Sequence, residues 1–386
     1  MSQARNFDFD QVKAKIDDMF QKFLHKPAEP PSTIKFKNDH VFKSDKQQKL
    51  QQVPPWDNFK LEEDYFEVVV NELFLAYSSK LWVQIDPTVL VNTKFGYDHK
   101  DFSVPYIVGP SSLSLPQGGV VPKGGKMVFS NTPVAGLYPY KGGRLNLTIV
   151  LSQVGTQSYA KTIIKLVESV AGALDYSTQL GAYIKIAGVI IDGIESLAGI
   201  TNGFNPVMGY TTPFSGPGYY ALINKPQTQV DSDQLWVVND ELRQGKDQDS
   251  AKPFLGSDTD YVLYSVNGAK ARNDMEFLSF YASYQKILDD AARNDDSSWK
   301  RAVTDMSTLY MTMYKSPDLT QTQALELYNA WKTEMTRIHD MNNPPSVKSI
   351  PPSSATFAPK VKKPELTAEE KKVLKESLKV LSLLKK

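Results

Sequence analysis

Cysteine is absent from this 386-residue chain. Its absence excludes disulfide bonds, thiolate metal ligands and cysteine nucleophiles, and it favours a reducing compartment. The N-terminal sequence MSQARNFDFD agrees, because acidic residues stand where a signal peptide needs an apolar stretch. We therefore expect a cytoplasmic protein.

A strong excess of one charge and a long apolar run are also missing. The formal net charge is +1 and the basic residues are scattered, so we expect no nucleic-acid partner. The segment from Ser196 to Asn224 carries no charge, but glycines and prolines interrupt it and predict loops. No stretch predicts a transmembrane helix.

Histidine is scarce, with four residues in the chain. His25 and His40 lie beside or inside a predicted linker, and His339 stands near the end of a predicted helix, where a positive charge suits the helix dipole. His99 lies between predicted strands, as a catalytic loop residue would. A polar hairpin turn is the simpler interpretation, since no G-x-S-x-G motif accompanies it, and a hydrolase centred on His99 remains our third functional hypothesis.

Motifs for phosphate and metal are incomplete. The glycine-rich stretch Gly118–Lys126 resembles a phosphate-binding loop, but Met127 follows the lysine where Ser or Thr is required. Paired aspartates could reach calcium, yet none continues into an EF-hand pattern, and Asx turns explain them more simply. These pairs are Asp231/Asp233, Asp247/Asp249 and Asp258/Asp260. The sequence therefore predicts no catalytic residue, no cofactor and no metal site.

The N-terminal region predicts a helix on a tether. Residues 1–25 form an expected amphipathic helix, and the proline-, lysine- and glutamine-rich residues 26–57 an expected flexible linker. The apolar face of the helix must either pack back on the protein's own core or dock into a partner. The residues of that face are Val12, Ile16, Phe20 and Phe23.

Two regions predict β-structure, residues 58–155 and their continuation 205–270. DYFEVVVNELFLAY at 64–77 is rich in β-branched and aromatic residues, as strands are. Frequent turn signals separate short strands and favour an antiparallel sandwich-like arrangement. The further strand candidates are 81–85, 89–95, 103–108, 126–130, 144–151, 219–223, 235–238 and 261–266.

Two other regions predict helices. Residues 156–204 place apolar side chains around most of the helix surface, which is typical of a buried helical hairpin. Glycines within 163–200 also suggest a second hypothesis, a membrane-perturbing effector whose hairpin inserts conditionally. Residues 271–341 form a helical region, with helices expected at about 277–293, 298–314 and 320–341.

The C-terminal region repeats the tethered-helix pattern. A proline- and lysine-rich linker is expected at 342–364, and an amphipathic helix at 365–386 with a capping box from Thr367 to Glu370. Its apolar stripe suits a partner groove, and the neighbouring lysines also suit conditional contact with a membrane surface. The stripe consists of Val373, Leu374, Leu378, Leu381 and Leu384.

Together these features predict an α+β protein, in which an antiparallel β-sandwich-like region packs with a helical region and tethered terminal amphipathic helices flank both. The leading functional hypothesis is a non-enzymatic interaction or scaffold protein that docks into an intracellular assembly through those helices. The expected partners are proteins, and the sequence leaves the oligomeric state open.

Overall fold

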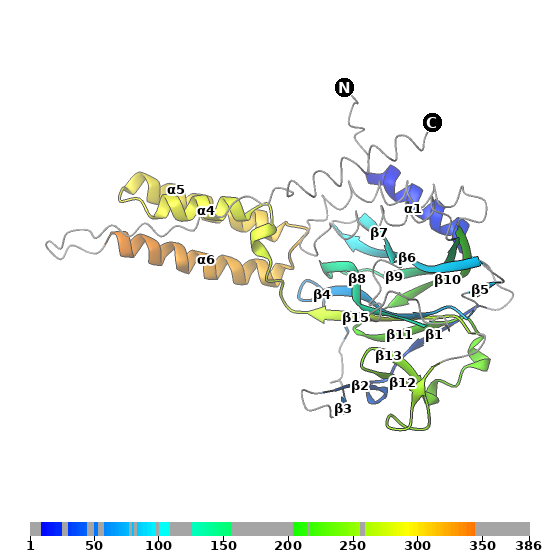
Figure 1. The fold of residues 1–386 in the computed structure, drawn as a ribbon. Helices are drawn as coiled ribbons and strands as arrows, with labels where there is room; N and C mark the ends of the chain where they lie inside the picture. Colours follow the sequence, from blue (N-terminus) through cyan, green and yellow to red (C-terminus); the bar gives the residue numbers. More distant parts are fainter. Residues whose placement is uncertain are drawn as a thin grey trace.

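The computed structural model confirms the α+β class, with several antiparallel sheets that pack together and with helices beside them (Figure 1). The residues that the structure describes are 9–24, 30–44, 50–52, 58–76, 79–80, 83–97, 100–108, 126–155, 204–214, 216–254 and 259–343.

The first sheet has the strand order β1-β11-β15-β4-β8, and every neighbouring pair is antiparallel. Its central strand pair joins residues from the two predicted β regions, which therefore form one structure. Its strands are β1 (Ser32–Lys35), β11 (Gly218–Ile223), β15 (Tyr261–Ala269), β4 (Tyr65–Phe74) and β8 (Lys126–Pro139).

The second sheet has the order β10-β9-β6-β5, with β7 also pairing with β6, and the third has the order β14-β13-β12-β2-β3. Within the third sheet, β12 and β2 are parallel. The second sheet consists of β10 (Phe204–Phe214), β9 (Leu145–Gly155), β6 (Val83–Tyr97), β5 (Ser79–Lys80) and β7 (Lys100–Val108). The third consists of β14 (Lys252–Pro253), β13 (Glu241–Gln244), β12 (Leu235–Val238), β2 (Val41–Ser44) and β3 (Leu50–Gln52).

The first sheet lies between the other two (Figure 1). Along β15, Val262 and Tyr264 pack in the core shared with the second sheet, whereas Tyr261 and Leu263 pack in the core shared with the third. Successive side chains of a strand point to opposite faces, so a strand buried on both faces must be apolar throughout. This explains the uninterrupted apolar run of Tyr261–Tyr264, which shows no alternation with polar residues.

The expected linker at 26–57 requires correction, because three strands of the structure, β1, β2 and β3, lie within it. Ile34, Phe36 and Val41 are buried in the core between the first and third sheets. Each apolar residue is separated from the next by lysines and polar residues, which lowers the average hydrophobicity of the segment. Backbone pairing with β11 and β12 supplies the remaining stabilisation, which composition does not reveal.

The charge-free segment Ser196–Asn224 contains β10, where loops were expected, and the whole of β11, which corresponds to the strand expected at 219–223. Pro206 lies at a register shift in β10, and β10 is an edge strand, where a missing amide hydrogen costs no ladder bond. Gly209 faces the end of the N-terminal helix, where a Cβ atom would lie 3.2 Å from the carbonyl oxygen of Phe23. The proline and the glycine therefore fit particular positions of an edge strand.

Helix α1 (Phe9–Phe23) packs on the second sheet, where its residues contact β7 and β9. Ile16, Phe20 and Phe23 are buried in the core of that sheet. Lys94 Nζ lies 2.7 Å from Asp17 Oδ1, which adds an ion pair at the same surface. Of the two arrangements that the sequence allows for this helix, the structure shows packing on the protein's own core.

The helices α4 (Tyr281–Ala291), α5 (Asp296–Tyr314) and α6 (Gln321–Asn342) extend away from the sheets as an arm (Figure 1). The side chain of Thr320 caps α6 by accepting a hydrogen bond from Gln323 N. The side chain of Asp295 caps α5 by accepting a hydrogen bond from Ser298 N. Hydrogen bonds from Ser297 and Ser298 hold the pKa of Asp295 below its usual range.

Short 3-10 helices complete the described structure: η1 (Asn38–His40), η3 (Gln227–Gln229), η4 (Ser232–Gln234) and η5 (Met275–Phe277). The predicted apolar hairpin at 156–204 lies outside the described residues, apart from Phe204 at the start of β10. The predicted C-terminal linker, beyond residue 343, and the predicted C-terminal helix lie outside them as well.

Candidate functional site: an apolar seam on the helical arm

The arm is joined to the sheets by buried hydrogen bonds. Tyr65, at the start of β4, donates its hydroxyl hydrogen to Gln323 Oε1 at 2.5 Å and accepts one from Thr320 N at 2.9 Å. Gln323 Nε2 in turn donates to the backbone oxygen of Arg272 at 2.6 Å. We call Tyr65, Arg272, Thr320 and Gln323 the junction. Each of them is buried, so the first turn of α6 is held directly against the first sheet.

An ion pair between Arg272 and Asp274 lies at the junction. Arg272 Nε donates to Asp274 Oδ1 at 2.6 Å and Arg272 Nη2 donates to Asp274 Oδ2 at 2.7 Å, the bidentate geometry of a strong ion pair. Burial by itself would lower the pKa of Arg272, but the hydrogen bonds and charge of Asp274 raise it above its ordinary value. Burial raises the pKa of Tyr65 to about 12, so its hydroxyl group remains a hydrogen-bond donor even at pH values where an exposed tyrosine ionises.

Aromatic side chains line the contact between α5 and α6. The rings of Tyr310 and Tyr328 lie 4.7 Å apart, and those of Trp299 and His339 are stacked at 3.9 Å. Because residue numbers rise along α5 as they fall along α6, the two helices are antiparallel. These pairs mark a seam along the arm that runs about 22 Å, at 1.5 Å per residue, from Trp299 to Tyr314.

Apolar side chains remain exposed along this seam. Val303 is 43% exposed, Tyr314 37% and Leu325 48%. On α5, Val303 follows Trp299 by four residues and Tyr314 follows Tyr310 by four, so each pair lies on one face of the helix. On α6, Leu325 precedes Tyr328 by three residues and lies on the same face as that tyrosine. We define the seam as Trp299, Val303, Tyr310, Tyr314, Leu325, Tyr328 and His339.

The face of α5 beside the seam lacks charge. From 303 to 314 its exposed side chains are valine, methionine, tyrosine, serine and threonine, and its one charged residue, Asp305, is half-buried. The hydroxyls of Thr304, Ser307, Thr308 and Thr312 donate to the backbone oxygen four residues earlier, at 2.9 to 3.2 Å. Since these hydroxyls already have an acceptor within the helix, covering them removes little hydrogen bonding with water. Such a face suits contact with another protein segment.

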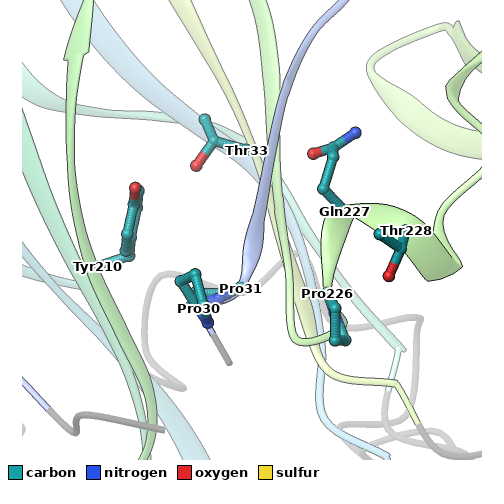
Figure 2. Close-up of a pocket in the computed structure, with 7 residues that line it drawn as sticks. All are labelled: Pro30, Pro31, Thr33, Tyr210, Pro226, Gln227 and Thr228. Atoms are coloured by element: carbon teal, nitrogen blue, oxygen red, sulfur yellow. The ribbon is translucent and has the colours of Figure 1, made fainter. Parts of the chain in front are cut away.

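A pocket of about 430 Å³ lies between the edge strands β1 and β10. Figure 2 shows Thr33 and Tyr210 on one side of the chain segment that leads into β1, and Gln227 and Thr228 on the other. None of its lining residues carries a formal charge, and Thr33 Oγ1 is buried without a hydrogen-bond partner in the described part of the chain. The pocket could hold a small polar group, but its walls offer no acid–base pair for catalysis. Its lining residues are Pro30, Pro31, Thr33, Tyr210, Pro226, Gln227 and Thr228.

The two histidines that the structure describes, His40 and His339, each stack on a tryptophan ring. His40 stacks on Trp236 at 4.2 Å, and its Nδ1 lies 2.8 Å from the backbone oxygen of Leu235. His339 belongs to the seam. His25 and His99 lie outside the described residues, so the structure does not test the hypothesis of a hydrolase centred on His99.

Three of the paired aspartates accept hydrogen bonds from backbone amides. Asp231 accepts from Asp233 N, and Asp260 Oδ1 accepts from Ala76 N at 2.8 Å. Asp247 accepts from Ser250 N, and the hydrogen bonds from Ser250 lower its pKa. Asp258 lies outside the described residues. Among the residues that the structure describes, no three His, Asp or Glu side chains gather in a way that could hold a metal ion.

The predicted docking residues fall into three groups. Ile16, Phe20 and Phe23 are buried under α1, whereas Val12 lies in α1 and nothing is described of its side chain. The C-terminal residues Val373, Leu374, Leu378, Leu381 and Leu384 lie outside the described part of the chain. The seam residues are not among the docking residues predicted from the sequence. The local sequence feature that marks them is the charge-poor stretch MSTLYMTMY at 306–314.

Comparisons with protein-family models, with curated proteins and with solved structures find no match to this chain. Among the helices that the structure describes, none combines the length and the apolar character needed to cross a membrane.

Proposed function

We propose that this chain is a non-enzymatic interaction or scaffold protein of the cytoplasm, which docks into a larger assembly through its helical arm and its tethered C-terminal segment. In this proposal a sandwich-like β body, flanked by the terminal helices, holds the arm in a fixed direction. The observation that carries the proposal is the seam, with exposed apolar side chains on an arm that extends from the sheets.

Three features support a docking role for the arm. The junction anchors the first turn of α6 by buried hydrogen bonds, so a partner bound to the arm would be held in a defined position relative to the sheets. Val303 on α5 and Leu325 on α6 are exposed apolar side chains, and from 306 to 314 α5 carries no charged residue, which favours apolar contact. Lys332 Nζ lies 5.7 Å from the ring centroid of Tyr328, so one basic side chain also lies at the seam. Aromatic residues at the centre of the seam are the residue type that dominates binding energy in interfaces.

A capture experiment from cytoplasmic extract tests the proposal. The full chain, used as bait, should retain a defined protein, and the variant Leu325→Glu should lose most of it, because a carboxylate then lies in the apolar contact. Met341→Glu is the matched control. Met341 is also exposed, at 66%, and lies sixteen residues further along α6, on the opposite side of the helix at about 100° per residue.

The outcomes separate the hypotheses. Loss with Leu325→Glu and retention with Met341→Glu would support docking through the seam. Equal capture by all three chains would contradict it. Recovery of the full chain with membranes and without a protein partner would instead favour the membrane-perturbing alternative that uses 163–200.

A further inference from the structure

We propose that the C-terminal segment 365–386 of the same chain occupies the α5–α6 seam, so that the protein covers its own docking site until a partner displaces the segment. This inference rests on the proposed function, because it names the resident occupant of the seam and thereby a form of regulation.

Apolar side chains of the seam are partly exposed to solvent. Val303 and Leu325 keep nearly half of their surface exposed, and Met311 on the neighbouring face of α5 is 48% exposed. Exposed apolar side chains that follow one line on two packed helices form the kind of surface that accepts a third helix. A third helix on this line would contact both α5 and α6.

The chain leaves the arm close to this surface. Helix α6 ends at Asn342, whose side-chain amide donates to the backbone oxygen of Ala292 at 3.1 Å, beside the turn between α4 and α5. Residues 344–364 separate the end of α6 from the C-terminal segment, and a chain of this length can span at most about 70 Å. Because α5 is 19 residues long, or about 28 Å, this linker can place the following segment on any part of the seam.

The C-terminal segment has the pattern that the seam requires. Leu374, Leu378 and Leu381 recur at spacings of four and three residues, which gathers them on one side of a helix. An apolar stripe of this kind cannot be buried by its own helix. A linker of this length gives an effective concentration near the millimolar range, so even a weak contact with the seam would be substantially occupied.

Engineered cysteine pairs test the inference, because the natural chain contains no cysteine. The pair Val303→Cys and Leu378→Cys is placed in the full chain, which is then oxidised mildly and analysed under non-reducing conditions. We expect a disulfide within one chain. The control pair is Ala330→Cys with Leu378→Cys, since Ala330 is exposed on α6 away from the seam, and it should remain reduced.

A labelling experiment gives a second readout. In the full chain carrying only Val303→Cys, the thiol should react with a maleimide about tenfold more slowly than in the same chain with Leu374→Ser and Leu381→Ser added, as expected for a weak contact at millimolar effective concentration. Val303 is exposed in the described part of the chain, and circular dichroism is used to check that each variant is folded.

Each result decides the inference. An intramolecular disulfide together with slowed labelling supports it. Disulfide-linked dimers alone would show that a second copy occupies the seam and would overturn it, as would absence of both the disulfide and the protection. If the seam variant Leu325→Glu still loses its partner in that last case, the proposed function stands and only the resident occupant is wrong.

Discussion

The hydroxyl of Tyr65 and the side-chain oxygen of Gln323 lie 2.5 Å apart, although the two residues are separated by 258 positions in the sequence. This hydrogen bond joins the first long strand to the first turn of α6. It is buried, so neither group can exchange its partner for water. The arm therefore depends on the sheets for its direction.

Removing this hydroxyl should destabilise the protein. Tyr65→Phe deletes the bonds to Gln323 and from Thr320 N and leaves both groups buried without that partner, at a cost of about 1–3 kcal/mol in the free energy of unfolding. Urea denaturation measures the change. Tyr140→Phe is the control, since it removes a single bond to Gly143 near the surface and should cost less than about 0.5 kcal/mol. Equal losses in the two variants would contradict a special role for the junction.

Buried tyrosines should make the protein sensitive to alkali. Burial raises the pKa of Tyr65 and of Tyr220 to about 12, from an unfolded value of 10.0. A group with a raised folded-state pKa contributes its full stability below the unfolded pKa and loses it as the pH rises through the folded pKa. The free energy of unfolding should therefore fall between about pH 10 and 12.

Urea midpoints measured from pH 8 to 11.5 test this alkaline loss. The slope should be smaller in Tyr65→Phe, because one of the shifted groups is then missing. A midpoint that stays constant across this range would show that the tyrosines ionise equally in the folded and unfolded chains.

A buried carboxylate links the first and third sheets. Glu72 on β4 accepts hydrogen bonds from Leu242 N at 2.7 Å and from the Tyr261 hydroxyl at 2.5 Å. Glu72→Ala removes both acceptors and leaves a cavity, so it should cost about 3 kcal/mol or more. Glu67→Ala, on the same strand but half-buried, is the control and should cost less than about 1 kcal/mol. Similar losses in the two variants would show that burial at Glu72 is unimportant.

The close approach of α1 to β10 should make Gly209 intolerant of a side chain. A Cβ atom there would lie 3.2 Å from the backbone oxygen of Phe23 and 3.3 Å from Leu24 Cα, so Gly209→Ala should displace the end of α1 and cost about 1–3 kcal/mol. Amide hydrogen exchange should rise in α1 and stay unchanged in α6. Unchanged protection of α1 would contradict this prediction.

Local patterns predicted much of the secondary structure. The strand expected at 64–77 contains β4, and the helices expected at 298–314 and 320–341 nearly match α5 and α6. These elements carry their own signals, namely β-branched runs, helical periodicity and the cap at Thr320. The strands within 26–57 and β10 were missed because they are stabilised by pairing with distant segments, which a local pattern cannot show.

The candidate site could be predicted from the sequence less well than the secondary structure. The charge-poor stretch 306–314 indicates an uncharged helix face around Tyr310, but no local pattern indicates that Leu325 is exposed, and only the packing of α5 on α6 brings the two faces together as a seam. The apolar face of α1 illustrates the reverse case, since its periodicity is the same whether the face meets a partner or the protein's own sheet.

By itself, the sequence determined the α+β class and the absence of disulfide and thiolate chemistry, because these depend on composition and on local periodicity. Only the tertiary structure decided how the sheets stack, that Ile16 and Phe20 are buried, and that the arm presents an exposed seam. The physical reason is that burial is a property of pairs of surfaces. A chain specifies each surface locally, but the contacts between residues such as Tyr65 and Gln323 exist only after folding.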